Sequence, residues 1–515
     1  MKLVILSLFA LALGLKAQCP GSDNLTVQTS TGTYTGLIDP QFPRTRQFRT
    51  IPFAKPPVLS RRWLPPQKLS SPPSEHHYAT RFPPSCPQFV TGVTSIYNQN
   101  LTKGNLIYNG NQNDSSGLVG EATSEDCLYL AVWTPTTALP PPDAGLPVLF
   151  FITGGGFWIG GVDIPWQLPP SWVERSQSHI VVTINYRLTI FGFPYARGLA
   201  DGHQNLGILD QRAALEWVRD NIAAFGCDPG RIMMWGQSAG SIAADIHAYA
   251  FYQDPIAQAY FLQSGSVFSY SPPKDPLYSN FSFVARHFGC EAPCGDDDGD
   301  GAAELDCMRQ VPFAQIVNFI GQYGDRGATP ALFFNGIPDD RIMFADYNAR
   351  SEAGLIARAG HHLDDRQRGP AVTAKDIARM CQILNSTVYR NRMGVPVFRF
   401  QYAGTFPNLN YYKWLGACHA SDLPITFGTY GLLDGIANTT SFEVEVSQSV
   451  QDHILAFAKD PYHGPQKMGW ELLVASDLHG GDLIRFGADG KVSQHVDGIE
   501  INGACSGVHD YNPFP

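Results

Sequence analysis

The interior of the sequence lacks an apolar run long enough to cross a membrane. The most apolar long uncharged stretch, residues 144–162, is interrupted by six glycines and fits a strand followed by a loop better than a spanning helix. We therefore expect no integral membrane segment. The chain ends also carry no evident lipid-anchor signal.

Positive charge is also scarce. The chain has 36 lysines and arginines against 46 acidic residues, a formal net charge of -10, and no basic stripe. Proteins that bind nucleic acid neutralise phosphates with such a stripe, so we expect no nucleic-acid partner.

Internal repeats and clean linkers are absent as well. Length by itself would suggest roughly two to four domains, but large α/β enzymes can run to this size as one domain. The chain has 515 residues, of which 44% are hydrophobic, and that is ample for one large core. We predict a single domain over residues 18–515 and make no prediction of oligomeric state.

The first 17 residues have the features of a secretory signal peptide. Lys2 precedes an apolar run at 3–15 that is too short to span a bilayer comfortably, and residues 15–17 form an acceptable cleavage site. We expect residues 1–17 to be removed and the protein to be secreted to the extracellular space.

Two features fit an oxidising compartment. The ten cysteines are plausible for disulfide bonds. Sequons of the form N-x-S/T, each a weak indication of N-glycosylation, complete the expectation of a secreted glycoprotein. They lie at Asn24, Asn100, Asn113, Asn280, Asn385 and Asn438.

The hydrophobic pattern favours an α/β fold. Strand-like apolar runs occur at 126–133, 147–152, 180–186 and 232–235, and residues 209–225 have apolar residues at helical spacing. Buried strands that alternate with helices indicate a large, mostly parallel central sheet flanked by helices.

The motif GQSAG at 236–240 is the most informative stretch of the chain. It is a G-x-S-x-G between a strand-like run and a segment with helical spacing, and this context disfavours a chance match. The two glycines lack the Cβ atoms that would clash in so tight a turn. Ser238, held there, can attack an ester carbonyl, because the N-terminus of the following helix favours the negative charge that develops.

Such a serine needs an oxyanion site and a base. Glycines 154–156 directly follow a strand, and their N–H groups, with that of Ala239, can stabilise an oxyanion. A phosphate loop is disfavoured because no Lys-Ser/Thr follows the glycines. Among the 14 histidines, His419 stands out because it follows a strand candidate and lies in a loop of small residues. On spacing alone a structural histidine is the commoner outcome.

Together these motifs resemble the type-B carboxylesterase family, which includes secreted fungal lipases and esterases, cholinesterases and the non-enzymatic neuroligins. The matching pieces cover nearly the whole mature chain and include SEDCLYLAVWTP (124–135), TGGGF (153–157), GQSAG (236–240), LQSGS (262–266) and GACHASDLPITFG (416–428). The resemblance implies an α/β-hydrolase fold and hydrolysis of small-molecule or lipid carboxylic esters. It implies no metal and no organic cofactor.

The resemblance also implies roles for single residues. Ser238 would be the nucleophile and His419 the base, with Gly155, Gly156 and Ala239 as the oxyanion hole. The implied disulfide bonds are Cys86–Cys127, Cys290–Cys307 and Cys381–Cys505, which leaves Cys19, Cys227, Cys294 and Cys418 unassigned.

The acid of the catalytic triad is the missing piece. The family places a glutamate after a strand, about midway between the serine and the histidine, and residues 359–375 contain no such strand-Gly-Glu segment. Either a local acid substitutes, with Asp364, Asp365 and Glu352 as candidates, or the acid is lost through a deletion or a gene-model error. A triad without its acid loses about 10⁴ in kcat. A missing strand would also disturb the sheet.

Three functions therefore stay open. The main prediction is a secreted serine hydrolase that cleaves carboxylic esters through an acyl-enzyme intermediate. The alternatives are an impaired or non-enzymatic family member and a triacylglycerol lipase with a lid at 86–127. Choline specificity is disfavoured because Gln237 stands where cholinesterases have glutamate, and segment 86–127 has no tryptophan. The acidic loop 296–301 resembles the start of a calcium loop, but Cys307 occupies the position of its bidentate glutamate, so we expect no metal there.

Overall fold

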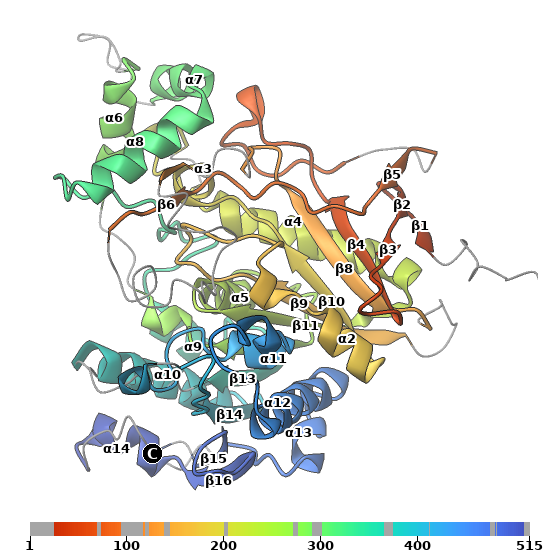
Figure 1. The fold of residues 1–515 in the computed structure, drawn as a ribbon. Coiled ribbons are helices and arrows are strands. Elements are labelled where there is room, and N and C mark those ends of the chain that lie inside the picture. The colour runs from red at the N-terminus through yellow and green to blue at the C-terminus, as the bar shows by residue number, and fades with distance from the viewer. Residues whose placement is uncertain are drawn as a thin grey trace, which may run out of the picture.

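The computed structural model describes residues 25–69, 74–93, 117–118, 123–137, 145–199, 204–270, 275, 277–290, 301–364, 374–410, 412–473, 479 and 481–508. An 11-stranded sheet lies at the centre of the molecule (Figure 1). Its strands are β3 (Leu37–Ile38), β4 (Thr45–Pro52), β8 (Tyr129–Pro135), β9 (Leu146–Ile152), β10 (Ile180–Ile184), β11 (Cys227–Gln237), β12 (Ala259–Gln263), β13 (Gly360–Asp364), β14 (Val397–Tyr402), β15 (Asp482–Phe486) and β16 (Ser493–Asp497).

The strand order is β16-β15-β14-β13-β12-β11-β9-β10-β8-β4-β3. Every neighbouring pair from β10 to β15 is parallel, and antiparallel pairs close both edges. The prediction of a large, mostly parallel sheet is confirmed. Two small sheets lie outside it: one joins β1 (Thr26–Thr29), β2 (Gly32–Thr35) and β5 (His76–Tyr78), and the other joins β6 (Phe89–Val90) and β7 (Gly117–Leu118).

Helices connect the strands and cover both faces of the sheet (Figure 1). They are α2 (Pro170–Ser176), α3 (Thr189–Gly192), α4 (Leu206–Asn221), α5 (Ala239–Ala250), α6 (Ser279–His287), α7 (Ala302–Gln310), α8 (Phe313–Asp325), α9 (Tyr347–Glu352), α10 (Ala374–Arg392), α11 (Leu423–Phe427), α12 (Ser441–Lys459), α13 (Gly464–Lys467) and α14 (Ile499–Ser506).

Two hydrophobic cores follow from the alternation of side chains along each strand. On β9, Val148 and Phe150 point into a core that they share with α4 and α5. Leu149 and Phe151 point to the opposite face, where α2, α11 and α12 supply the packing. A third cluster joins α3 to the layer formed by α6, α7 and α8 (green in Figure 1).

The strand that the sequence analysis found missing is present. β13 lies between β12 and β14 and is parallel to both, with His361 opposite Val397 and Asp364 opposite Phe400. The prediction that this strand is absent was therefore wrong. The residues His361 to Asp364 are too polar to resemble a buried strand, yet the two neighbouring strands supply the backbone hydrogen bonds that define one. The sheet is continuous across this position.

The disulfide bonds join the same pairs that the resemblance implies. They are Cys86–Cys127, Cys290–Cys307 and Cys381–Cys505. Cys227 and Cys418 are free thiols and buried. Cys19, Cys294, residues 1–17 and most of the acidic loop at 296–301 lie outside the described residues. Within the described part of the chain, no helix has the length and apolarity needed to cross a bilayer.

Candidate active site

A sharp turn between β11 and α5 presents Ser238. The strand ends at Gln237, the helix begins at Ala239, and Ser238 between them has φ 57° and ψ -122°. This conformation is strained for a residue with a side chain and is typical of functional positions. A Cβ atom on Gly236 would lie 2.1 Å from the carbonyl oxygen of Gly240. The turn therefore requires glycine at that position.

Ser238 and His419 are hydrogen-bonded to each other. The distance from His419 Nε2 to Ser238 Oγ is 2.9 Å, and both residues are half-buried. Ser238 follows β11 and His419 comes from the loop after β14, so the parallel strands bring them to one edge of the sheet. A serine hydroxyl within hydrogen-bond reach of an imidazole is the arrangement that nucleophilic catalysis needs.

The loop that carries His419 is tightly wound. Ala420 has φ 74°, a value that costs an L-residue about 1–2 kcal/mol. Asn410 Nδ2 donates to the carbonyl oxygen of Gly416 at 2.5 Å, and Ser421 Oγ donates to that of Cys418 at 2.8 Å. These hydrogen bonds hold the loop in a conformation that the backbone alone disfavours.

The glycine loop after β9 lies against the turn at Ser238. A Cβ atom on Gly154 would lie 2.6 Å from Gln237 O and 3.2 Å from Ser238 Cβ. Gly155 and Gly156 have φ 102° and 69°, and Gly156 is exposed. The start of the glycine loop therefore lies against the turn that carries Ser238, and Ala239 is the first residue of α5.

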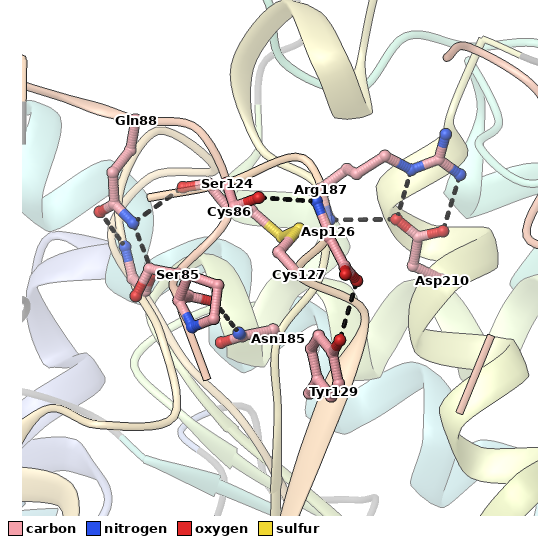
Figure 2. The surroundings of a disulfide bond; sticks show 12 residues. Ser85, Cys86, Gln88, Ser124, Asp126, Cys127, Tyr129, Asn185, Arg187 and Asp210 are labelled. Carbon is pink, nitrogen blue, oxygen red and sulfur yellow. Dashed lines mark hydrogen bonds and ion pairs between the residues drawn. A yellow bond between two sulfur atoms is a disulfide. The ribbon is translucent and has the colours of Figure 1, made fainter. Parts of the chain in front are cut away.

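Gln88 holds the far end of this glycine loop. Its Nε2 donates to the carbonyl oxygen of Gly160 at 2.9 Å, and its Oε1 accepts from Gly160 N–H at 3.0 Å. Gln88 lies next to the Cys86–Cys127 disulfide (Figure 2). The disulfide therefore tethers the segment that fixes the glycine loop.

A buried ion pair fixes the end of β10 in the same region (Figure 2). Arg187 donates to both carboxylate oxygens of Asp210 on α4, at 2.8 and 2.7 Å. Arg187 N–H also donates to Asp210 Oδ2 at 3.0 Å. Bidentate pairs of this kind add geometric specificity.

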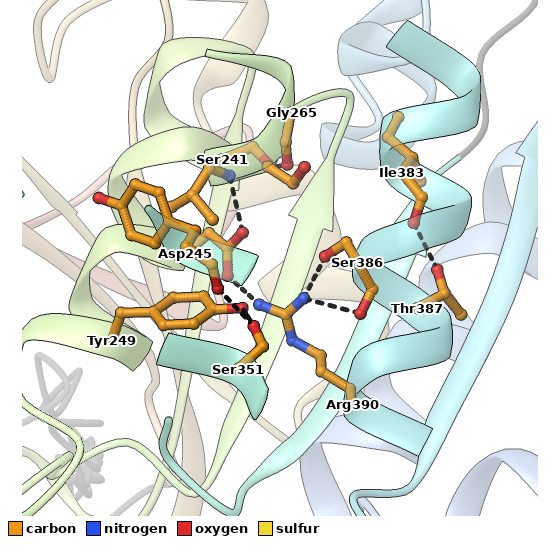
Figure 3. A network of polar contacts seen from close by, with 12 residues as sticks. Ser241, Asp245, Tyr249, Gly265, Ser351, Ile383, Ser386, Thr387 and Arg390 are labelled. Carbon is orange, nitrogen blue, oxygen red and sulfur yellow. Dashed lines mark hydrogen bonds and ion pairs between the residues drawn. The ribbon is translucent and has the colours of Figure 1, made fainter. Parts of the chain in front are cut away.

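The turn after β12 braces α5 from the other side (Figure 3). Ser241 Oγ donates to the carbonyl oxygen of Gly265 at 2.6 Å, and Val267 N–H donates to Asp245 Oδ2 at 2.8 Å. Asp245 also forms a fully buried ion pair with Arg390 of α10. Burial raises the pKa of the Asp245 carboxyl, an effect that the Arg390 guanidinium partly offsets.

The three acid candidates have different positions. Glu352 is an exposed residue at the end of α9, and its neighbour Ser351 is hydrogen-bonded to Tyr249 near the C-terminus of α5. Tyr249 is about 16 Å from Ser238 along the helix axis, at 1.5 Å per residue. Asp364 ends β13, the strand next to β14, and Asp365 lies outside the described residues. Of the two described candidates, Asp364 lies at the sheet edge that carries Ser238, and Glu352 does not.

The described residues contain no group of three or more His, Cys, Asp or Glu side chains placed to hold a metal ion. Two supporting contacts near the site were not predicted from the sequence: that of Gln88 with Gly160, and that of Gln263 Nε2 with Asp422 Oδ2 at 3.0 Å. Gln263 and Asp422 lie in the segments LQSGS and GACHASDLPITFG, which match the family, and that match was the available signal.

Known proteins resemble this chain over most of its length. The model of the carboxylesterase family matches residues 23–351. A chlorogenic acid esterase from Aspergillus niger is 34% identical over 94% of this chain and 94% of its own. Secreted lipase 5 from Gibberella zeae is 32% identical over 98% of both chains.

A solved structure of a PNB esterase has the same fold. It superposes with a TM-score of 0.71 over 92% of this chain and 97% of its own, at 22% sequence identity. At that identity the likeness shows the fold, and the family follows from the sequence matches. The chain belongs to the carboxylesterase family and is a carboxylic ester hydrolase with an α/β-hydrolase fold.

Proposed function

We propose that the protein is a secreted serine esterase that works through an acyl-enzyme intermediate. The observation that carries the proposal is the 2.9 Å hydrogen bond between Ser238 Oγ and His419 Nε2, beside a glycine loop. A non-catalytic binding protein of this family would not require a serine hydrogen-bonded to a histidine.

In the proposed reaction Ser238 Oγ attacks the ester carbonyl carbon while His419 accepts its proton. The N–H groups of Gly155, Gly156 and Ala239 donate to the oxyanion of the tetrahedral intermediate. His419 then protonates the leaving alcohol, and the acyl group stays on Ser238. Water attacks the acyl-enzyme with the same assistance, which releases the carboxylic acid and the free serine.

We infer that the triad acid comes from the carboxyl end of β13, as Asp364 or Asp365. The position of β13 beside β14 supports this inference, because the loop after β14 carries His419. A carboxylate at that edge would fix the imidazole tautomer and stabilise the imidazolium. The alternative is an impaired enzyme in which neither aspartate serves.

The substrates we propose are soluble carboxylic esters of small molecules. Gly156 is exposed and Ser238 is half-buried, which supports access from solvent. One relative is named a chlorogenic acid esterase, so esters of that kind are the first to test. Because another is named a secreted lipase, triacylglycerol hydrolysis is the second candidate. Most of the lid proposed for 86–127 lies outside the described residues.

Secretion and glycosylation belong to the same proposal. Three relatives are named as secreted lipases, and disulfide bonds suit an extracellular protein. Asn438 is exposed in the loop before α12, whereas Asn280 is buried and donates to the carbonyl oxygen of Phe333 at 3.2 Å. Asn385 is exposed on α10. Among the described sequons, Asn438 and Asn385 are therefore better placed to carry a glycan than Asn280.

The test compares the parent protein with Ser238→Ala on p-nitrophenyl acetate and butyrate. We expect the substitution to lower kcat by roughly 10⁶, the loss typical of a nucleophilic serine. Ser282→Ala, a half-buried serine on α6, is the matched control and should keep the parent rate. Activity that survives Ser238→Ala would contradict the proposed nucleophile, and an inactive parent would favour the impaired alternative. A rate increase above the solubility limit of tributyrin would favour the lipase.

A further inference from the structure

Gln263, the last residue of β12, contacts the backbone of Ser238 and the loop that carries His419. It is fully buried, and its carbonyl oxygen accepts from Ser238 N–H at 2.8 Å. Its side-chain Nε2 donates to Asp422 Oδ2 at 3.0 Å, and Asp422 is three residues after His419. One residue thus connects the strand beside the nucleophile with the loop of the base.

The side-chain amide of Gln263 is held in a fixed orientation. Its Oε1 accepts from Trp235 Nε1 at 2.5 Å, and its Nε2 lies 3.4 Å from Thr426 Oγ1. Trp235 belongs to β11 and Thr426 to α11, and both are buried. Because Oε1 faces the indole N–H, Nε2 must face the carboxylate of Asp422.

The backbone between His419 and Asp422 is held in one conformation, so the two residues are coupled in position. Ser421 N–H and Oγ both donate to the carbonyl oxygen of Cys418, and Ala420 has φ 74°. A residue with a side chain keeps such a conformation only where its surroundings fix it. A shift of Asp422, which is also buried, would therefore move the imidazole of His419.

We propose that Gln263 is a positioning residue that sets the place of His419 relative to Ser238 through Asp422. The proposal rests on the proposed function of that pair. Gln263 contacts the loop of the base and the nucleophile turn, so its loss should act on kcat and leave KM nearly unchanged. A misplacement of about 1 Å at a catalytic group costs on the order of 10² in rate.

Exchanging the hydrogen-bond donor and acceptor between residues 263 and 422 distinguishes a positioning role of Gln263 from a role in packing alone. Gln263→Glu keeps the shape but places a second carboxylate against Asp422 in a buried space, which disfavours both charges. Asp422→Asn combined with Gln263→Glu restores one carboxylate facing one amide, with donor and acceptor exchanged. Trp235 Nε1 still finds an oxygen acceptor in the double variant. The double variant should therefore regain the hydrogen bond between residues 263 and 422, with the same net charge as the parent.

The experiment measures kcat and KM for p-nitrophenyl butyrate per active site, together with Tm, for the parent, Q263E, D422N and Q263E/D422N. We expect Q263E to lower kcat about 10²-fold with KM within about twofold, and the double variant to recover most of that loss. The matched control is Q211E, which buries a carboxylate on α4 beside His247. It should lower Tm and leave kcat per active site unchanged.

Gln263→Asn replaces Q263E if that variant does not fold. Gln263→Asn shortens the side chain by one methylene, which withdraws the amide from Asp422 without adding charge. We expect it to lower kcat about as much as Q263E. Parent-like kcat in the folded variant, or a double variant no faster than Q263E, would overturn the role of Gln263. Failure of the underlying function is distinguishable, because the parent itself would then be inactive or would not be acylated at Ser238.

Discussion

At the scale of single residues, the site depends on backbone conformations that most side chains avoid. Ser238 has φ 57°, Gly155 has φ 102° and Ala420 has φ 74°. Such values cost free energy, and they persist where neighbouring contacts over-determine them. In this protein the contacts come from the turn after β12, the Gln88 amide and the loop around His419.

Gly155→Ala should damage the oxyanion loop. A Cβ atom there would lie 2.2 Å from the carbonyl oxygen of Ile159, so the loop must move. We expect kcat to fall about 10²–10³-fold, the loss typical of an oxyanion donor. Gly324→Ala on α8 is the control, because no atom would lie within 4 Å of its Cβ. Equal kcat values for the two variants on p-nitrophenyl butyrate would show that the clash with Ile159 does not disturb the active site.

The triad acid can be assigned by two single substitutions. We expect either Asp364→Asn or Asp365→Asn to lower kcat about 10⁴-fold, because the imidazole would adopt the wrong tautomer. The other substitution should have a much smaller effect, since only one carboxylate can occupy the position. Glu352→Asn, at the exposed end of α9, is the control. Parent-like activity in both aspartate variants would contradict an acid from β13.

At the scale of elements, the carboxyl ends of neighbouring parallel strands assemble the site. The glycine loop follows β9, Ser238 follows β11, Gln263 ends β12, and the loop of His419 follows β14. β13 completes this row, because it pairs with β12 on one side and with β14 on the other. The spacing between the turn at Ser238 and the loop of His419 therefore includes this strand.

The helix behind the base loop carries a pH-sensitive group. α12 packs on α11 through Ser447 Oγ, which donates to Ile425 O at 2.6 Å. Glu443, in the first turn of α12, forms a capping box with Thr440. Burial raises the pKa of the Glu443 carboxyl from its ordinary 4.5 to about 7. The folded state thus binds this proton more tightly than the unfolded chain does.

This shift predicts how stability depends on pH. The contribution of Glu443 to the free energy of unfolding should be greatest below about pH 4.5 and fall as the pH rises through about 7. Glu443→Gln keeps an acceptor for the cap but cannot titrate, so it should remove this part of the dependence. Urea unfolding of both proteins between pH 5 and 8 measures it, with Glu445→Gln on the exposed side as control. A stability difference between parent and Glu443→Gln that does not change with pH would contradict the shift.

The sequence predicted those elements whose signal is local. The apolar runs of β9, β10 and β11 and the helical spacing of α4 all correspond to elements of the structure. β13 was missed because its strand character comes from pairing with its neighbours and not from its own polar residues. Tertiary context overrides intrinsic preference in such strands.

The same distinction holds for the site. Ser238 and the glycine loop lie in short sequence motifs that indicate their function by themselves. His419 was predicted from its loop of small residues and from the match of that segment to the family. The contact between Gln263 and Asp422 joins residues 159 positions apart, and no local pattern indicates it. Gln88 likewise acts on Gly160 across 72 positions. Supporting contacts of this kind become visible only when the chain is folded.

At the scale of the whole molecule, the 11-stranded sheet with helices on both faces brings residues from four chain regions to the carboxyl ends of its strands. Three disulfide bonds cross-link the described part of the chain. Membership in the carboxylesterase family and the α/β-hydrolase fold agree with this architecture. The proposed function requires one covalent intermediate, an acyl group on Ser238.

Mass spectrometry of the protein after treatment with diethyl p-nitrophenyl phosphate tests that intermediate most directly. The reagent phosphorylates activated serines and releases p-nitrophenol. We predict one diethylphosphoryl group per chain, located on the peptide that contains Ser238, with esterase activity lost in proportion and no adduct on Ser238→Ala. Continued ester hydrolysis with Ser238 unmodified, or loss of activity with the adduct on another residue, would contradict the account.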